Sequence, residues 1–477
     1  MYDYDLVVIG SGPAGEKGAT QSAYFGKRVA VIEKEPKLGG ACIHTGTLPS
    51  KTLRETALYL SGLQQRALYG VACEVRGDVS VPELMCRQEP VIGSQNDRIH
   101  DNLEKHGIAL LHGNARFVDE HTVEVVSSSA RTQRLTADVV LIATGTTPFR
   151  PPFVPFEDPD VDDSDTILKL PSVPKRLVIL GGGVIGCEYG SMFAALGCAV
   201  TIVEGRDSIL GFLDVEVNHL LSDRLRAIGV ELVLGRQVVN VGRIDGLLHC
   251  TLDDGHDLPC ERLLFAGGRS GNTAGLGLER VGIVPDARGL LKVDGHYAVV
   301  GAKGGRIYAA GDVIGFPALA SVAMEQGRVA MCQAFELGFK TRVAPVFPYG
   351  LYTIPEVSMV GETEESAAKK GLDFEIGRAR YRDNARGQII GDVDGLVKLL
   401  FTVPDKKIIG VHVLGERATE LVHMGLAVMH FGGTLDDFID MVFNFPTLSE
   451  LFKYAAYDGL GRLARRQTFA AAPPSVA

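Results

Sequence analysis

The sequence lacks any pair of cysteines at C-x-x-C spacing, although it holds eight cysteines among its 477 residues. No cysteine and histidine group stands at zinc-ligand spacing either, so no metal site is expected. Thiols scattered singly along a chain are typical of a reducing compartment. We therefore expect a cytoplasmic protein.

Positive charge is also scarce, since 48 Lys and Arg face 58 Asp and Glu, which gives a net charge of −10. This balance disfavours nucleic acid and anionic membrane surfaces as partners. The most apolar region, residues 177–203, is interrupted by glycines and by Glu188, so we do not expect a membrane span. An apolar strand pattern starts at residue 5, which leaves no room for a signal peptide.

The length and composition are those of a multidomain globular protein. A chain of 477 residues exceeds one hydrophobic core and predicts about three domains. Hydrophobic residues make up 46% and charged residues 22%, as in ordinary folded domains. The 57 glycines cluster in turns between expected strands and helices rather than in a low-complexity tract.

The first dinucleotide-binding pattern lies at the N-terminus. Residues 5–9 form a continuous apolar run typical of a buried parallel strand, and the glycine motif of residues 10–15 follows. A second strand, residues 28–32, ends at Glu33, 18 residues after Gly15. The glycines allow a pyrophosphate to approach a helix N-terminus, and the carboxylate can accept hydrogen bonds from a ribose. The alternative is a glycine-rich turn without a ligand.

The same pattern recurs later in the chain. A strand at residues 176–180 precedes the glycine motif of residues 181–186, and the strand at residues 199–203 ends at Glu204. Two such units predict a flavin dinucleotide and a nicotinamide dinucleotide. Glu204 favours the free ribose of NAD, whereas Arg206 could meet the 2′-phosphate of NADP or be a solvated surface residue.

Two further segments suggest joints between domains. Residues 139–145 read as a buried strand that ends in a small-residue turn, and several prolines follow it. Residues 306–312 read as another strand, which enters a Gly-Asp turn before a helix near Leu319. Asp312 could bind a cofactor hydroxyl or could instead cap that helix.

The segment of residues 39–51 reads G-G-A-C-I-H-T-G-T-L-P-S-K. This pattern resembles the redox loop G-G-x-C-x-x-x-x-C-x-P-S-K of the class I pyridine nucleotide-disulfide oxidoreductases, the superfamily of lipoamide dehydrogenase and glutathione reductase. Cys42 stands at the first cysteine position and Thr47 at the second. Because a disulfide needs two sulfurs, this loop cannot form one.

The resemblance covers about residues 5–462 and implies an α/β fold with two Rossmann-like domains and a C-terminal α+β dimerisation domain. The implied order is an FAD-binding domain (1–150), an NAD(P)-binding domain (151–268), a return to the FAD-binding domain (269–345) and an interface domain (346–477). It also implies a homodimer in which the partner's C-terminal segment completes each active site.

A second departure from the disulfide reductases lies near the C-terminus. They carry H-x-H-P-T-x-x-E, in which the second histidine is an acid-base group, whereas this chain reads F-N-F-P-T-L-S-E at residues 443–450. Phe445 cannot transfer a proton, and Glu450 has no histidine to orient. The thiol and the base are therefore lost together, which points to a different oxidant.

This pair of losses resembles the soluble, Si-specific NAD(P)+ transhydrogenase family. The resemblance implies that hydride passes from NADPH to flavin N5 and then to NAD+, with both nucleotides using one site in turn. An NAD(P)H dehydrogenase that reduces a quinone or dye is an alternative. A non-catalytic flavoprotein subunit is a second alternative, which both fingerprints disfavour.

The resemblance also implies the site residues. Lys51 would approach flavin N5 paired with Glu188, Thr47 would place a hydroxyl by the flavin, and Cys42 would be either a packed or a redox residue. His44 could form a hydrogen bond within the loop or lie beside a cofactor. His423 and His430 are expected to serve packing or solvent contact rather than catalysis. The expected cofactor-binding residues are Gly10, Gly12, Pro13, Ala14, Gly15, Glu33, Lys34, Gly40, Ala41, Cys42, Thr47, Lys51, Ala115, Ala143, Thr144, Gly145, Gly181, Gly183, Val184, Ile185, Gly186, Glu188, Glu204, Arg206, Gly268, Arg269, Gly311, Asp312, Leu319, Ala320, Phe445 and Pro446.

Overall fold

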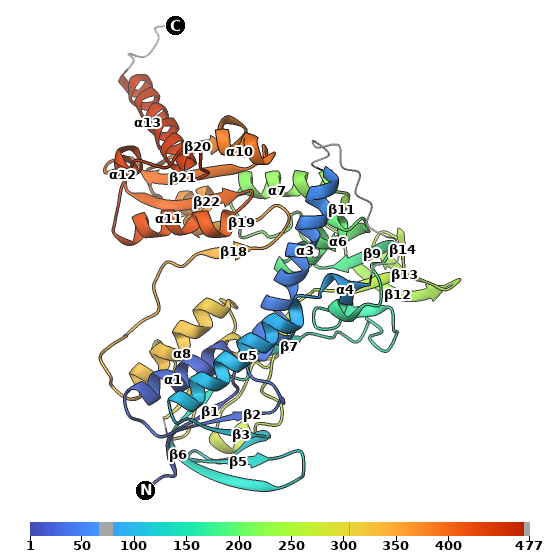
Figure 1. Cartoon of the computed structure of the whole chain (residues 1–477), viewed down its shortest axis with the longest axis vertical. Helices are drawn as coiled ribbons and strands as arrows, with labels where there is room; N and C mark the ends of the chain where they lie inside the picture. The colour runs from blue at the N-terminus through green and yellow to red at the C-terminus, as the bar shows by residue number, and fades with distance from the viewer. Residues whose placement is uncertain (66–79, 305, 472–477) are drawn as a thin grey trace.

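The computed structural model describes residues 1–65, 80–304 and 306–471. Two sheets with parallel strands and a separate antiparallel sheet form three bodies, and an extended segment connects the first body to the last (Figure 1). The predicted fold class of two Rossmann-like units and a C-terminal α+β domain is confirmed.

The first sheet has the order β3-β2-β1-β6-β5-β4, and β17 pairs with β6. Strands β1, β2, β3, β6 and β17 pair in parallel, and β4, β5 and β6 pair antiparallel. The bounds are β1 (Tyr4–Ile9), β2 (Val29–Glu33), β3 (Ala109–His112), β4 (Asn114–Asp119), β5 (Thr122–Val126), β6 (Thr132–Ile142) and β17 (Ile307–Ala309). The return of the chain as β17 places residues around position 310 beside the first glycine motif.

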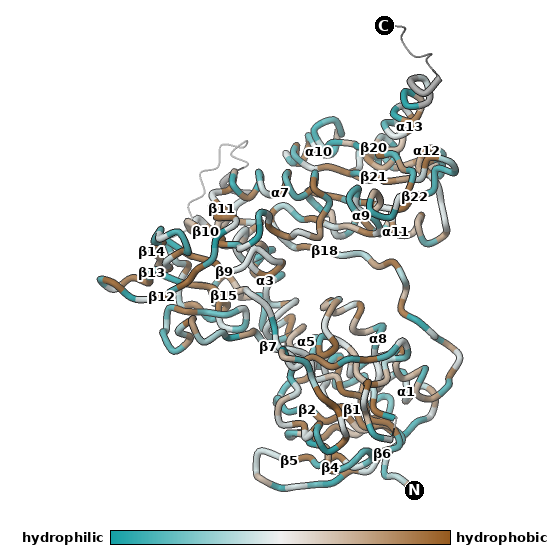
Figure 2. Tube along the Cα trace, turned by 180° about the vertical axis from the view of Figure 1, so that it is seen from behind, coloured by the Kyte–Doolittle hydropathy of each residue, from teal (hydrophilic) through white to brown (hydrophobic). Residues whose placement is uncertain are grey.

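Helices pack on this sheet, because β1 and the last residues of β6 are continuous apolar runs that are buried. Figure 2 shows the region of β1 as hydrophobic. Helix α1 packs against α8, and a Cβ at Gly327 would lie 2.1 Å from Ala14 O, so only glycine allows this approach. The helices are α1 (Pro13–Tyr24), α2 (Gly40–His44), α3 (Thr47–Gln65), α4 (Val81–Leu84), α5 (Gln88–Lys105) and α8 (Ala320–Ala334).

The second sheet is wholly parallel, in the order β11-β10-β9-β15-β8, and a meander β12-β13-β14 and a small β16-β7 pair accompany it. The bounds are β7 (Thr146–Pro148), β8 (Val161–Asp163), β9 (Arg176–Leu180), α6 (Val184–Ala195), β10 (Ala199–Glu204), α7 (Val215–Ala227), β11 (Val230–Leu234), β12 (Val238–Ile244), β13 (Leu247–Leu252), β14 (Asp257–Cys260), β15 (Arg262–Phe265) and β16 (Arg269–Gly271).

The third sheet is antiparallel, in the order β18-β19-β22-β21-β20, and α13 extends away from it (Figure 1). The bounds are β18 (Tyr349–Leu351), β19 (Val357–Gly361), α9 (Glu364–Lys369), β20 (Phe374–Arg380), α10 (Ala385–Ile390), β21 (Leu396–Thr402), β22 (Ile408–Leu414), α11 (Ala418–His430), α12 (Leu435–Asp440) and α13 (Glu450–Ala471). Within the described ranges, no helix is both long and apolar enough to cross a membrane.

The cysteines are less scattered in space than in the sequence. The β13–β14 hairpin brings the buried Cys250 and Cys260 close together, and this pairing and burial raise the pKa of the Cys250 thiol. All seven cysteines that the structure describes are free, and Cys73 lies outside the described residues.

Candidate active site

One continuous cavity of about 2360 Å³ runs between the first and second sheets. Both glycine motifs, the loop of residues 39–51 and the turn after β17 line it. The cavity is therefore bounded by the carboxyl ends of parallel strands, where α/β proteins bind their ligands.

The first glycine motif has three glycines with three different surroundings. A Cβ at Gly10 would meet Ala143 O at 2.4 Å, and a Cβ at Gly15 would meet Gly10 O at 1.9 Å. A Cβ at Gly12 would meet no atom within 4 Å and would point into open space. Two glycines thus allow close packing of the turn, and Gly12 leaves room where a pyrophosphate would meet the N-terminus of α1.

The second glycine motif repeats this arrangement. A Cβ at Gly181 would lie 2.8 Å from Ala266 O, a Cβ at Gly186 would lie 1.9 Å from Gly181 O, and a Cβ at Gly183 would meet nothing within 4 Å. Both motifs therefore fit a dinucleotide. Thr144 supports this fit at the first, because its Oγ1 is buried, its residue lines the cavity and the atom has no protein partner.

The acids that end β2 and β10 are held in the same way but have different neighbours. Glu33 accepts the backbone N–H of Ser11 at 2.9 Å and that of Glu35 at 2.9 Å, as well as the Ser11 hydroxyl at 2.7 Å. Both carboxylate oxygens thus hold the turn while Glu33 still lines the cavity.

Glu204 accepts the backbone N–H of Gly182 at 2.8 Å and that of Arg206 at 3.0 Å. The Arg206 guanidinium adds a fork of two bonds to this carboxylate, at 2.9 Å from Nε and 3.1 Å from Nη2. Burial alone would raise the pKa of Glu204, but these bonds outweigh it and hold the pKa below its usual value. Arg206 is therefore not a free surface residue.

Lys51 and Glu188 join the two halves of the cavity. Lys51 Nζ, on α3, donates to Glu188 Oε2 on α6 at 2.7 Å, as the resemblance implied. Glu188 Oε1 accepts the backbone N–H of Tyr352 at 2.9 Å, and Lys51 Nζ lies 4.7 Å from the Tyr352 ring centroid. Three distant segments thus fix one ammonium at the cavity wall.

The loop before Lys51 holds Cys42 beside Thr47. Burial raises the pKa of the Cys42 thiol, and a hydrogen bond with the Thr47 side chain only partly offsets this effect. A thiol with a raised pKa and no sulfur partner is a poor nucleophile. His44 Nε2 lies 2.6 Å from the carbonyl oxygen of Leu38, so this imidazole closes the loop on itself.

Asp312 lies at the turn after β17. Helix α8 begins at Ala320 with Leu319 at its N-cap, so the helix-capping alternative for Asp312 is wrong. Its carboxylate accepts the Thr146 hydroxyl at 3.3 Å and lines the cavity, and burial raises its pKa. These features are those expected of a group that faces a ligand hydroxyl.

Most of the predicted site residues line this one cavity. Gly15 and Gly186 do not, because they pack against the preceding turns. Phe445 and Pro446 do not line it either, and Phe445 is 75% exposed. Within a single chain, the segment around Phe445 stays away from the cavity.

The sequence did not single out several residues that contribute to the site. Ser11 holds Glu33, Tyr352 covers Lys51, and Asp165 lines the cavity with a pKa raised by burial. Ser11 lies inside the first glycine motif, and Tyr352 lies in the segment of residues 349–356. Their positions in these two segments are the signal that could have identified them. His423, expected to serve packing or solvent, also lines the cavity.

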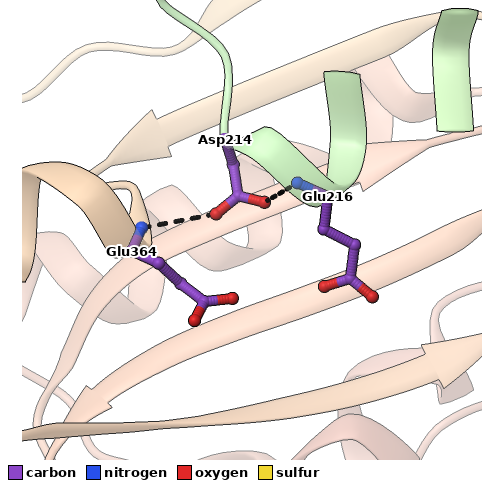
Figure 3. A group of neighbouring side chains, drawn as sticks. All are labelled: Asp214, Glu216 and Glu364. Carbon is purple, nitrogen blue, oxygen red and sulfur yellow. Dashed lines mark hydrogen bonds between the residues drawn. The ribbon is translucent and has the colours of Figure 1, made fainter. Parts of the chain in front are cut away.

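A group of carboxylates outside the cavity resembles a metal site, formed by Asp214, Glu216 and Glu364 (Figure 3). The fully buried Lys398 ammonium occupies its centre, 2.7 Å from Asp214 Oδ1 and 3.1 Å from Glu216 Oε2, and it also pairs with Glu364. Burial would lower the pKa of Lys398, but the carboxylates outweigh it and raise that pKa. The group is therefore a salt-bridge cluster between the second and third bodies.

The geometry agrees with the family comparisons. The model described as "Pyridine nucleotide-disulphide oxidoreductase" matches residues 4–327, and its dimerisation-domain model matches residues 347–456. The chain belongs to this family.

Within the family, the chain is similar to proteins named soluble pyridine nucleotide transhydrogenases. A soluble pyridine nucleotide transhydrogenase of Mycobacterium tuberculosis (strain ATCC 25177 / H37Ra) is 46% identical, covering 98% of this chain and 100% of the relative. One from Azotobacter vinelandii is 41% identical, covering 97% and 99%. Among solved structures, LpdA from Mycobacterium tuberculosis is similar with a TM-score of 0.87 and 27% identity, covering 95% of this chain and 99% of that one. The flavoprotein disulfide reductase RclA from Escherichia coli has a TM-score of 0.84 and 28% identity, covering 95% and 99%.

Proposed function

We propose that this protein is an FAD-dependent transhydrogenase that moves hydride between NADPH and NAD+ without a redox disulfide. The observation that carries the proposal is Thr47 beside Cys42, on the same cavity wall as the Lys51–Glu188 pair. The site keeps the charged groups of a flavin enzyme and lacks the second sulfur. The transhydrogenase relatives support this function.

The chain's own residues would then hold and orient the two nucleotides. Bound FAD would supply two-electron hydride chemistry at its isoalloxazine ring. The first glycine motif and Glu33 would hold its adenosine half, and Lys51 would keep a positive charge at the reacting end. The second motif would hold the nicotinamide nucleotide, and the cavity between them would exclude bulk water from the aligned rings.

We also propose that two copies assemble so that the partner's C-terminal segment closes each cavity. The dimerisation-domain match supports this assembly, as do the exposed apolar side chains of Phe431, Val442 and Phe445. Phe445 would bring a ring, and no proton donor, to the closed site.

The division at residues 150, 268 and 345 is likewise proposed, with an FAD-binding part on either side of an NAD(P)-binding part. The β17 strand supports the return segment, since it pairs with β6. A cytoplasmic location is proposed on the free thiols of the described cysteines.

A steady-state assay tests the proposed function. The flavin-loaded enzyme is mixed with NADPH and either thio-NAD+ or a soluble quinone, with free flavin as the blank. We expect rapid reduction of thio-NAD+ and slow reduction of the quinone. Transfer to thio-NAD+ no faster than the blank would overturn the proposal, and a dominant quinone rate would favour a dehydrogenase.

A further inference from the structure

The two dinucleotide units of this chain differ at one charged position. Every residue of the second motif lies 171 positions after its counterpart in the first, from Gly10 and Gly181 to Glu33 and Glu204. At the same offset, Glu35 in the first unit corresponds to Arg206 in the second. The first unit therefore serves as a reference within the same chain, and the difference at this position is the arginine of the second unit.

The backbone N–H at this position makes the same hydrogen bond in both units. The N–H of Glu35 donates to Glu33 at 2.9 Å, and the N–H of Arg206 donates to Glu204 at 3.0 Å. Only the side chains differ, so the turn itself does not require an arginine. The first unit presents two carboxylates, whereas the second presents a carboxylate bound to a guanidinium.

The Arg206 side chain is exposed enough to move away from Glu204. Its side chain is 60% exposed, whereas that of Glu204 is 10% exposed, and both residues line the cavity. The arginine can therefore turn about its own side-chain bonds while the backbone bonds keep Glu204 in place.

We propose that Arg206 is an exchangeable partner that lets the adenosine pocket of the second unit accept both NAD and NADP. This inference rests on the proposed function, because one pocket must then take two nucleotides that differ by a 2′-phosphate. With NAD, Arg206 gives up one of its two guanidinium bonds to Glu204, and the freed lone pair accepts a ribose hydroxyl. With NADP, Arg206 leaves Glu204 and binds the 2′-phosphate through charge-assisted hydrogen bonds.

The charges explain why both residues are needed. A carboxylate alone would repel the 2′-phosphate, as the Glu33 and Glu35 pair of the first unit would, and an arginine alone would give no acceptor for the ribose hydroxyl. While Arg206 is bound, its hydrogen bonds hold the pKa of Glu204 below the usual value. Arg269, the other arginine among the described lining residues, is held by Thr146 Oγ1 and Thr146 O, both at 2.8 Å.

Binding of two nucleotide fragments tests the exchange without any hydride transfer. Adenosine 2′,5′-bisphosphate and 5′-AMP are titrated into the flavin-loaded enzyme by calorimetry. For Arg206→Gln we expect the bisphosphate to bind on the order of 10- to 100-fold more weakly, because charge-assisted bonds are lost. The AMP affinity should change by less than about 3-fold.

Two further variants sharpen the test. Glu204→Gln should weaken AMP by roughly 10-fold and leave the bisphosphate as tight or tighter, because a repulsive charge is removed. Arg206→Glu copies the charges of the first unit and should abolish bisphosphate binding. Arg236→Gln is the matched control, since Arg236 pairs with Asp254 at 3.0 Å and does not line the cavity.

An equal loss of both fragments in Arg206→Gln would overturn the proposal, because Arg206 would then act only by holding Glu204. No loss of either fragment would overturn it as well. The assay separates this inference from the proposed function. Arg206-dependent fragment binding in an enzyme that does not reduce thio-NAD+ would sustain the exchange and refute the function.

Discussion

The two dinucleotide units share a backbone and differ in what surrounds it. In both, a Cβ at the middle glycine would meet open space, and a Cβ at the last glycine would lie 1.9 Å from the carbonyl oxygen of the first glycine. Yet the first unit ends in the Glu33 and Glu35 pair and the second in Glu204 with Arg206. We propose that the glycines allow a dinucleotide to bind, whereas the side chains after the second strand select which one.

The units also differ in their connections to the rest of the chain. The second unit continues into α7, whose N-cap Asp214 pairs with the buried Lys398 of the third sheet. The first unit instead packs α1 against α8 through Gly327. Each unit should therefore be separable from the other by mutation.

The largest effect is expected at the last glycine of each motif. A Cβ there would lie 1.9 Å from a backbone oxygen, so Gly15→Val and Gly186→Val should each destabilise their unit by more than about 4 kcal/mol. Gly15→Val should lose bound flavin, and Gly186→Val should keep flavin but lose nucleotide binding. Flavin absorbance measures the bound flavin, and titration with NADH measures nucleotide binding. Loss of flavin in Gly186→Val would contradict the independence of the two units.

The next effect concerns the tie between the second unit and the third sheet. Lys398→Met leaves the fully buried Asp214 carboxylate without its ammonium partner, while Glu216 and Glu364 keep Arg378, and this should cost about 3–5 kcal/mol of unfolding free energy. Denaturant unfolding measures it. Arg226→Met is the control, because Arg226 forms an exposed pair with Asp223 and should cost less than about 1 kcal/mol. Equal effects of the two would contradict a structural role for the cluster.

A smaller effect is expected where the two units meet. Lys51→Met removes the ammonium at the cavity wall and should slow hydride transfer roughly 100- to 1000-fold, because a fixed charge at the reacting end is lost. Stopped-flow measurement of the NADPH reaction detects it, with Lys369→Met as a control, because Lys369 is exposed and does not line the cavity. An unchanged rate with intact flavin content would show that Lys51 serves only to join α3 and α6.

The smallest effect is a pH dependence confined to the second unit. The pKa of Glu204 is held down in the folded state, so its contribution to stability is present above the unfolded value of about 4.3 and is lost as pH falls through the lowered pKa. Arg206→Gln should remove less than about 1 kcal/mol, since Arg206 is largely exposed. The difference from wild type should vanish in acid, and a difference that grew in acid would contradict this assignment.

Sequence patterns predicted the backbone of the site better than its side-chain partners. The glycines and the terminal acids follow from local rules, since each glycine answers a turn or a close approach. The Arg206–Glu204 fork depends on a rotamer, and the contact of Asp165 with the cavity depends on how β8 meets the loop of residues 39–51, so neither could be predicted. Lys398 is the one charged residue of the otherwise mainly apolar strand β21, and a lysine in such a strand is a visible signal of a buried ion pair.

The central claim is that the site passes hydride without a disulfide, and anaerobic titration with NADPH tests it most directly. The account predicts that one equivalent of NADPH per subunit bleaches the flavin absorbance, that no long-wavelength thiolate–flavin band appears, and that NAD+ restores the oxidised spectrum. A stable charge-transfer band, or uptake of four electrons per subunit, would contradict it.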